Sequence, residues 1–245
     1  MNNMWNYIFD KKKVYFKNID LQKLKKLNFE KISFYLTNEV YHIFTFPKYL
    51  ELINFISKKI KLKERNSLCD FGSGNGGILY HLIKKFDLHK CYSLEISQNQ
   101  LNFQKKFIPN TKFIKIDFSS IKKLKKIKNQ SVDIVIVNSV TQYFYSDEYC
   151  KNVLKELYRI TSDKLFIYDI KNKKLQNEYI SSISKRRKMK IIDYKKLYKK
   201  TPLRFYNKEF FIKHCKRNNI KFNIYKLPSF ALDNKYGFCL LMKKK

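Results

Sequence analysis

The chain alternates between short, continuously apolar runs and longer stretches in which apolar residues recur every three or four positions. The run Val132–Val137 is rich in β-branched residues, as is typical of a strand buried on both faces of a sheet. The stretch from Ile78 to Phe86 shows helical spacing instead. Strands separated by helices predict an α/β fold with a doubly wound, mostly parallel sheet, whose ligand crevice lies at the carboxyl edge of the strands.

Each expected strand of this sheet ends at a polar residue. Beside the run before Gly72, strands are expected at Lys90–Leu94, Lys112–Ile116, Val132–Val137 and Leu165–Tyr168, and the residues at the ends are Asp70, Glu95, Asp117, Asn138 and Asp169. Ser97 with Gln100 is typical of a capping box opening a helix through Phe107, and Ser146 opens another helix. We expect a helix after Asn207 and a final hairpin of Lys221–Leu227 and Tyr236–Met242. The predicted division is a helical N-terminal extension or lid at 1–62 and a ligand-binding domain at 63–245.

Glycine is rare in this chain, and four of its five glycines stand at positions 72, 74, 76 and 77. Glycine is required where φ is positive or where a ligand approaches the backbone. A strand, a glycine-rich turn and a helix in this order predict a nucleotide-binding loop at a helix N-terminus. Gly72, Gly74 and Gly77 with Glu95 also satisfy the nicotinamide dinucleotide fingerprint, so an oxidoreductase stays open at this point. Asp70, however, would repel a pyrophosphate and suits a ligand that carries an ammonium and a sulfonium.

With Asp70-Phe-Gly72-Ser-Gly74-Asn-Gly76, Glu95, Asp117-Phe118 and the strand Asp133–Asn138, residues 66–170 resemble the class I S-adenosylmethionine-dependent methyltransferases. The resemblance implies a seven-stranded Rossmann-like sheet with an antiparallel C-terminal hairpin, and S-adenosylmethionine as cofactor. It implies cofactor contacts from Asp70, Gly72, Ser73, Gly74, Gly76, Glu95, Ile96, Asp117, Phe118 and Asn138. Asp70 would meet the ammonium, Glu95 the ribose, Asp117 the adenine amine, Ile96 and Phe118 the adenine faces, and Asn138 the sulfonium region.

Methyl transfer from a sulfonium is an in-line displacement, and only some acceptors require a base for it. The candidates for such a base are His42, Tyr143, Asp169 and Tyr206, and none of them is assigned the role. The sequence shows neither a catalytic triad nor a metal-ligand cluster, and its five cysteines are widely spaced without a CxxC pair. No metal is therefore expected.

The segment 139–144 and the helix behind it resemble the small-molecule branch that includes enzymes of bacterial surface-polysaccharide loci. We therefore expect a small-molecule or glycan-precursor acceptor. The Asn/Asp-Pro-Pro-aromatic motif of nucleic-acid amine methyltransferases is missing after Asn138.

The formal net charge is +33, yet only six of the 53 basic residues are Arg. An excess of Lys, Asn and Ile beside one Ala indicates A/T-rich codon usage, which competes with a nucleic-acid interpretation of the charge. The strongest basic cluster, Lys185–Lys200, lies in an insertion at 171–206 and would suit an anionic acceptor or RNA, so an RNA methyltransferase stays an alternative. We expect a cytoplasmic protein, because neither a membrane-spanning run nor a secretory signal is evident.

Overall fold

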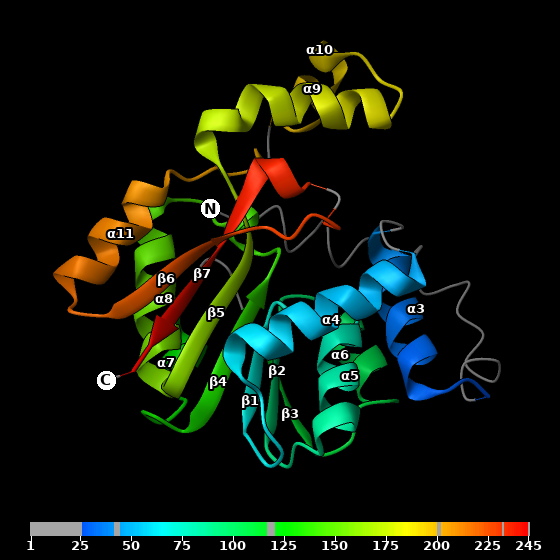
Figure 1. The fold of residues 1–245 in the computed structure, drawn as a ribbon, viewed down its shortest axis with the longest axis vertical. Coiled ribbons are helices and arrows are strands. Elements are labelled where there is room, and N and C mark those ends of the chain that lie inside the picture. The colour runs from blue at the N-terminus through cyan, green and yellow to red at the C-terminus, as the bar shows by residue number, and fades with distance from the viewer. Residues whose placement is uncertain (1–25, 42–44, 117–120, 200–201, 232, 245) are drawn as a thin grey trace.

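The fold was analysed in a computed structural model that describes residues 26–41, 45–116, 121–199, 202–231 and 233–244. Its centre is one seven-stranded sheet of strand order β3-β2-β1-β4-β5-β7-β6 (Figure 1). The strands are β1 (Leu68–Phe71), β2 (Cys91–Glu95), β3 (Thr111–Lys115), β4 (Val132–Asn138), β5 (Thr161–Lys171), β6 (Lys221–Lys226) and β7 (Gly237–Lys243). The first five pair in parallel, whereas β7 is antiparallel to β5 and to β6. The predicted doubly wound sheet with an antiparallel ending is thereby confirmed.

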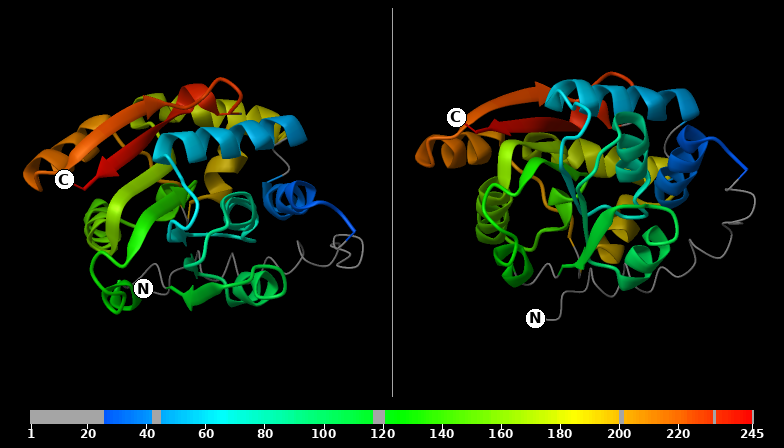
Figure 2. Two further views of the ribbon diagram at one scale, coloured as in Figure 1. Left: turned by 60° about the horizontal axis from the view of Figure 1, so that its bottom comes forward. Right: turned by 90° about the horizontal axis from the view of Figure 1, so that it is seen from below.

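Helices cover both faces of the sheet (Figures 1 and 2). One face is packed by α3 (Phe29–Tyr41), α4 (Phe46–Ile60), α5 (Gly77–Phe86) and α6 (Gln98–Gln104), and the other by α7 (Lys122–Lys125), α8 (Asp147–Ile160) and α11 (Lys208–Arg217). In the central strand β4, Val135 and Val137 face one apolar core, and Ile134 and Ile136 face the other. All four side chains are at most 1% exposed, which explains the uninterrupted apolar run of this strand.

Strand β5 is eleven residues long, against the four expected at Leu165–Tyr168. Its extra length follows from its pairing with β4, which begins at Thr161, and with β7, which reaches Lys171. Polar residues at both ends of β5 conceal this pairing in the sequence, because hydrogen bonds to a partner strand do not require apolar side chains. The other expected strands agree with the structure to within one or two residues.

The capping box predicted at Ser97 forms only in part. Ser97 Oγ accepts a hydrogen bond from the Gln100 amide at 3.4 Å, which opens α6 as expected. The Gln100 side chain donates instead to Asn75 Oδ1 at 3.3 Å, and the Ser97 amide donates to Glu95. The helix ends at Gln104 rather than at Phe107. The Gln100 contact links α6 to Asn75 of the glycine-rich loop, and the Ser97 contact links it to Glu95, which itself accepts from Gly74 of that loop.

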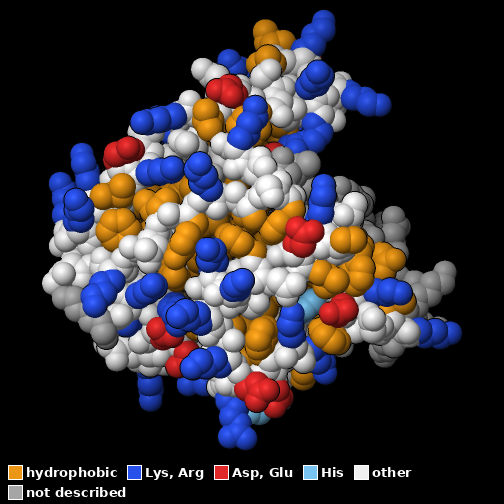
Figure 3. Space-filling view, in the orientation of Figure 1, with side chains coloured by type: hydrophobic (Ala, Val, Ile, Leu, Met, Phe, Trp, Pro, Cys, Tyr) orange, Lys and Arg blue, Asp and Glu red, His pale blue; other side chains and the backbone are white. Residues whose placement is uncertain are grey.

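The insertion after β5 forms α9 (Gln176–Arg186) and α10 (Ile191–Leu197), which stand beyond the carboxyl end of β5 (Figure 1). Tyr179, Ile183 and Tyr194 pack there with Tyr236 in a small core separate from the two main ones. Lys and Arg side chains project from the end of the insertion that lies farthest from the sheet (Figure 3). Among the described residues, no helix combines the length and the apolar character that a membrane crossing requires.

Candidate cofactor site

The glycine-rich loop connects β1 to α5 through a backbone that other residues would strain. Gly72, Gly74 and Gly76 have φ values of +78°, +58° and +78°. Gly77 is helical, but a Cβ there would collide with Thr37 Oγ1 and lie 2.5 Å from the carbonyl oxygen of Ser33, both on α3. A Cβ at Gly74, in contrast, would meet no heavy atom within 4 Å. The loop thus requires glycine for positive φ, and at Gly77 for the close approach of a second helix.

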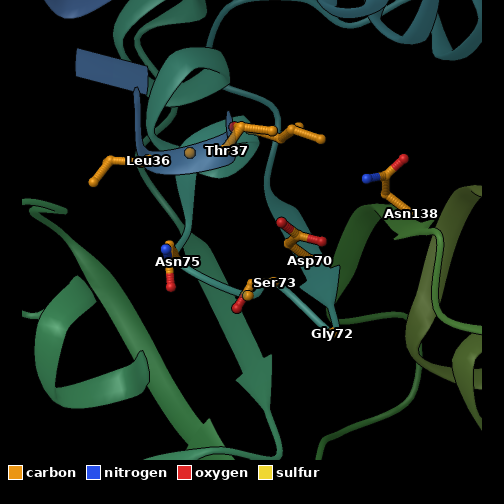
Figure 4. Close-up of a pocket in the computed structure, with 10 residues that line it drawn as sticks. Leu36, Thr37, Asp70, Gly72, Ser73, Asn75 and Asn138 are labelled. Atoms are coloured by element: carbon orange, nitrogen blue, oxygen red, sulfur yellow. The ribbon is translucent and has the colours of Figure 1, made fainter. Parts of the chain in front are cut away.

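A cavity of about 30 Å³ lies between this loop, the ends of β1 and β4, and α3. It is lined by Leu36, Thr37, Asp70, Gly72, Ser73, Gly74, Asn75, Gly77, Ile78 and Asn138. Figure 4 shows the Asp70 and Asn138 side chains rising from neighbouring strands toward the same side, with Thr37 across from the loop. This volume is sufficient for one or two waters and too small for a nucleoside. A nucleoside therefore enters only if the covering side chains or α3 move.

Asp70 is the most unusual group in the cavity. It is 2% exposed, and its Oδ1 has no hydrogen-bond partner among the described residues. Burial, together with the nearby charge of Glu95, raises the pKa of Asp70 from 3.8 to about 8. A buried carboxyl oxygen without a partner is costly, and a cation bound against it would remove the cost.

Asn138 ends β4 beside the same cavity, because β1 and β4 are neighbours in the sheet. Its Oδ1 also lacks a partner among the described residues. Asn75, which the sequence analysis did not select, adds a buried Nδ2 without a partner in that part of the chain. Unpaired acceptors of two side chains therefore lie next to the backbone of the loop, as a cationic polar ligand would require.

Glu95 lies at the end of β2 and holds the loop by its backbone. Its Oε2 accepts a hydrogen bond from the Gly74 amide at 2.8 Å. Its Oε1 accepts from the Ile96 amide at 2.8 Å and from the Ser97 amide at 3.0 Å. The carboxylate predicted to bind the ribose is thus 4% exposed and orders three backbone amides.

A network of neutral side chains, not predicted from the sequence, connects the loop to β2 and α6. Gln104 Nε2 donates to Ser73 Oγ at 2.9 Å and to the Gly74 carbonyl oxygen at 2.6 Å. Ser93 Oγ donates to Gln104 Oε1 at 2.6 Å and is 2.7 Å from Ser73 Oγ. These residues come from β2 and α6, and only the three-dimensional fold brings them to the loop. The predicted Ser73 side chain is therefore turned into this network.

The remaining predicted cofactor residues lie apart from the cavity or outside the described structure. Gly76 is the N-cap of α5, and Ile96 is buried in the core beneath α7 and α8. Asp117 and Phe118, expected at the adenine, lie outside the described residues, as does the candidate base His42.

The backbone is unusual at two neighbouring positions of β4 and β5. Ser139 directly follows β4 and has a φ of +55°, and Asp169, at an irregularity in the pairing of β5 with β7, has a φ of +62°. Ser139 Oγ donates to Asp169 Oδ2 at 2.9 Å, and Lys171 Nζ donates to Asp169 Oδ1 at 2.9 Å and to Asp233 at 3.1 Å. Burial opposes the charge of Lys171, but the carboxylates and Tyr179 outweigh it and raise its pKa. Both oxygens of the candidate base Asp169 are therefore engaged.

The two tyrosine candidates lie in different surroundings. Tyr143 lies in the loop after β4, where burial raises its pKa and where it interacts electrostatically with Lys171, Tyr198 and Asp169. Tyr206 is 2% exposed in the core and donates to the Thr141 carbonyl oxygen at 3.3 Å. Tyr143 thus lies at the carboxyl edge of the sheet, called the reaction edge below, whereas Tyr206 lies in the core. The described residues contain no cluster of three metal-ligating side chains.

Part of the chain is similar in sequence to known proteins. Residues 69–166 match the family model described as a methyltransferase domain. Among curated proteins, the nonribosomal peptide synthetase kk1B of Curvularia clavata is 26% identical over 125 residues, which are 49% of this chain and 1% of that protein. The nonribosomal peptide synthetase penN of Penicillium thymicola is 30% identical over 129 residues, 50% of this chain and 4% of that protein. The chain thus spans only a small part of the curated relatives it matches.

Solved structures share the fold over nearly the whole chain. A putative S-adenosyl-L-methionine-dependent methyltransferase of Methanococcus maripaludis has a TM-score of 0.58 at 19% identity, covering 90% of this chain and 95% of that one. Magnesium protoporphyrin IX methyltransferase of Synechocystis PCC 6803, with bound SAH, has a TM-score of 0.60 at 15% identity, covering 100% and 98%. Geranyl diphosphate C-methyltransferase of Streptomyces coelicolor has a TM-score of 0.59 at 10% identity, covering 98% and 97%.

The matched domain begins within β1 and includes the glycine-rich loop and Asn138, which line the cavity, and Glu95, which accepts from the loop backbone. The unpaired carboxyl oxygen of Asp70 fits a cationic cofactor and would repel a dinucleotide pyrophosphate. Residues 69–166 are accordingly similar to a methyltransferase domain, and the chain has the fold of solved S-adenosylmethionine-dependent methyltransferases.

Proposed function

We propose that the chain transfers the methyl group of S-adenosylmethionine to a small-molecule acceptor bound next to Asn138. The observation that carries the proposal is the buried carboxyl oxygen of Asp70, which has no partner among the described residues and lies beside the loop backbone. An ammonium group placed there would pair with this oxygen. The placement of Asn138 one strand away supports a reaction centre between β1 and β4.

S-adenosylmethionine supplies a methyl group on a sulfonium, which is displaced in line. The protein's part is mainly to hold the reactants in line, and orientation of this kind contributes about 7–11 kcal/mol. In this proposal Asp70 binds the ammonium, and the loop backbone at Gly72–Gly74 lies against the methionine part. Asn138 Oδ1 stabilises positive charge near the transferred methyl group. Asp117 and Phe118 keep their predicted roles at the adenine.

Glu95 would bind the ribose hydroxyls in this proposal. Its Oε2 is the oxygen bonded to Gly74, whereas Oε1 is held by two amides of the turn that follows. Binding through Glu95 therefore requires that the Gly74 amide lose or share this acceptor. The exchange would couple cofactor entry to movement of the glycine-rich loop.

Of the candidate bases that the structure describes, we assign the role to Asp169. It lies in β5 directly after Tyr168, the partner of Asn138 at the end of β4, and its carboxylate accepts from Ser139, the residue after Asn138. Tyr206 is directed into the core instead. An acceptor that already offers a lone pair needs no base, so Asp169 would act only on a hydroxyl or a protonated amine.

The acceptor class rests on two supports. Two of the similar solved structures are named for small-molecule substrates, a porphyrin and a diphosphate. The match with this chain covers 98% and 97% of those two chains. The loop after Asn138 lacks the paired prolines of nucleic-acid amine methyltransferases. Within this class, a glycan precursor is the narrower proposal that the sequence resemblance favours.

RNA is a second candidate acceptor, favoured by one observation. Lys185, Arg186, Arg187, Lys188 and Lys190 are all exposed on the insertion. If RNA is the substrate, binding should weaken steeply with salt, and changing Lys185, Lys188 and Lys190 to Gln should reduce the slope. Weak, sequence-independent binding that these changes leave unaltered would remove this candidate.

The principal experiment measures binding of S-adenosylhomocysteine to the full chain by calorimetry. Asp70→Asn should weaken binding about 10-fold or more, because a charge-assisted contact is worth about 1.5–3 kcal/mol. Asp163→Asn, at the opposite end of the sheet, removes the same charge and should leave affinity unchanged. Equal affinities of the wild type and Asp70→Asn would refute the assignment of Asp70.

A further inference from the structure

A hollow of about 250 Å³ lies between α9, α10 and the segment 202–205. Its apolar wall is formed by Ile180, Leu203 and Phe205. The hollow is also lined by Tyr194 and Tyr198, whose ring centroids lie 4.6 Å apart with the ring planes tilted by 36°. A space bounded by flat rings and aliphatic side chains is suited to an apolar body of the size of a few fused rings or a short chain.

The hollow is connected to the reaction edge by the backbone. The Arg204 amide, in the wall segment, donates to the Gln142 carbonyl oxygen at 2.9 Å. Gln142 Nε2 in turn donates to the Ser139 carbonyl oxygen at 2.7 Å, and Ser139 directly follows Asn138. Tyr143 of the same loop interacts electrostatically with both Tyr198 and Asp169. The loop after β4 therefore begins at Asn138 of the cofactor cavity and is hydrogen-bonded to the segment 202–205 that forms part of the wall of the hollow.

Tyr194 carries a polar group that the fold does not use. It is 3% exposed, and its hydroxyl has no hydrogen-bond partner among the described residues. Buried hydroxyls are nearly always paired with protein or water. Since Tyr194 lines the hollow, a ligand there would provide the missing partner.

The charge of the hollow has one sign. Lys195 and Lys199 line it and are exposed, whereas none of the described residues that line it is acidic. Arg187 lies within 6.0 Å of both ring centroids and donates to the Tyr198 hydroxyl at 2.6 Å. An anionic group would therefore be attracted to this side of the hollow, next to the apolar wall.

We propose that the hollow is the acceptor subsite, and that the acceptor is an amphipathic anion: a flat or chain-like apolar body with a phosphate or carboxylate. The body lies against Phe205 and the rings of Tyr194 and Tyr198, and the anion pairs with Lys195 and Lys199. This inference rests on the proposed methyl transfer and specifies which small molecules the enzyme accepts.

The test uses the full chain saturated with S-adenosylhomocysteine and two fluorescent probes, 1-naphthyl phosphate and 1-naphthol. Binding is followed by the fluorescence of the naphthyl group. The phosphate should bind about 10-fold more tightly than the alcohol, and salt should reduce the difference. Changing both Lys195 and Lys199 to Gln should remove most of this preference. Changing Lys213 and Lys216 to Gln, on α11, removes the same charge elsewhere and should preserve it.

The Tyr194 hydroxyl provides a second, independent arm. Tyr194→Phe should weaken naphthyl phosphate binding about fivefold, within the range of one hydrogen bond, without lowering stability. Tyr168→Phe removes another buried hydroxyl that lacks a partner in the described part of the chain, and should not change binding. Equal binding of both probes, or equal loss in the α11 control, would overturn the inference. If S-adenosylhomocysteine itself fails to bind, the proposed function fails instead.

Discussion

Asp70 is buried, and its Oδ1 has no hydrogen-bond partner among the described residues; these two properties are difficult to combine without a ligand. Its position before the glycines could be predicted from the sequence, because a carboxylate at that strand end conflicts with a pyrophosphate. The engagement of Glu95 by three backbone amides could not be predicted. Residue identity indicates which ligand a carboxylate can bind, whereas its actual partners depend on how a loop folds back on it.

The raised pKa of Asp70 predicts how the stability of the ligand-free protein depends on pH. The folded state keeps the proton up to a pH of about 8, whereas the unfolded chain releases it near the ordinary value of 3.8. The folded state therefore binds more protons in this window, and the free energy of unfolding falls as pH rises through it. Urea unfolding from about pH 6.5 to 8 should show this decline, and Asp70→Asn should flatten it.

The lower half of the same window is less informative because His81 acts in the opposite direction. Burial, with a smaller effect of Lys85, lowers the pKa of His81 from 6.5 to about 4. Between these values the unfolded chain binds the extra proton, so the His81 contribution to stability grows as pH rises. A wild-type slope above pH 6.5 equal to that of Asp70→Asn would contradict the assignment of the buried proton to Asp70.

Changing Glu95 is predicted to affect both binding and stability. The sequence suggests that Glu95→Ala weakens cofactor binding by about 2 kcal/mol, through two lost ribose contacts. The structure adds that three backbone amides lose their acceptor, so the free energy of unfolding should also fall by about 1–3 kcal/mol. Calorimetry and urea unfolding separate the two effects. Unchanged stability would mean that water replaces the carboxylate at all three amides.

Helix α3 packs against α5 through a close backbone contact, a polar bond and a ring contact between Phe29 and His81. Gly77 permits the close contact, and Ser33 Oγ lies 2.9 Å from His81 Nδ1. Leu36 and Thr37 of α3 cover the cavity. A sequence without an alignment does not show that Gly77 faces another helix. The glycine cluster could be predicted as a ligand loop, but the different requirement at each glycine could not.

Two alanine substitutions, at Gly77 and at Gly74, should therefore differ in how they affect stability and cofactor binding. Gly77→Ala places a Cβ against the backbone of α3 and should lower the free energy of unfolding by about 1–3 kcal/mol, as overpacking does. Gly74→Ala meets no atom, and its positive φ costs about 1–2 kcal/mol.

The difference between the two should appear in binding. The new Cβ at Gly74 would project into the space that the proposal gives to the cofactor, so affinity should fall by more than the stability loss alone requires. Gly77→Ala acts through α3, so any binding loss should accompany a loss of helix packing. Both are measured by calorimetry with S-adenosylhomocysteine beside urea unfolding. Full affinity in Gly74→Ala would place the cofactor elsewhere.

Parallel pairing of β1, β4 and β5 is what brings the reaction edge together, since it places Asp70, Asn138 and Asp169 at one end of the sheet. This much could be predicted from the strand pattern. The insertion could not be interpreted in the same way, because α9 and α10 form their own small core with Tyr236 of the distant C-terminal segment. Contacts between segments so far apart in the chain have no signature in local periodicity. The hollow beside them was accordingly not predicted.

Cofactor binding should stabilise the folded chain by mass action if the cavity opens to admit the ligand. S-adenosylhomocysteine at about 100 times its Kd should add about 2.7 kcal/mol to the free energy of unfolding. For a chain of this length, that corresponds to an increase in Tm of about 5–10 °C. Because the cavity of about 30 Å³ must enlarge, part of the binding free energy is spent on moving α3 or the loop, and Kd includes this cost. Thermal unfolding with increasing ligand measures the shift.

The same measurement distinguishes the two nucleotide cofactors that the glycine pattern alone allowed. Above a pH of about 8, where Asp70 is ionised in the ligand-free protein, a nicotinamide dinucleotide at equal concentration should leave Tm unchanged, because its pyrophosphate would face the buried carboxylate. Asp70→Asn removes that repulsion together with the partner for the ammonium. It should therefore reduce the shift with S-adenosylhomocysteine without creating a comparable shift with the dinucleotide, whose ribose and nicotinamide contacts the loop does not supply. A dinucleotide shift in the wild type as large as that of S-adenosylhomocysteine would mean that the loop backbone, rather than Asp70, determines cofactor choice.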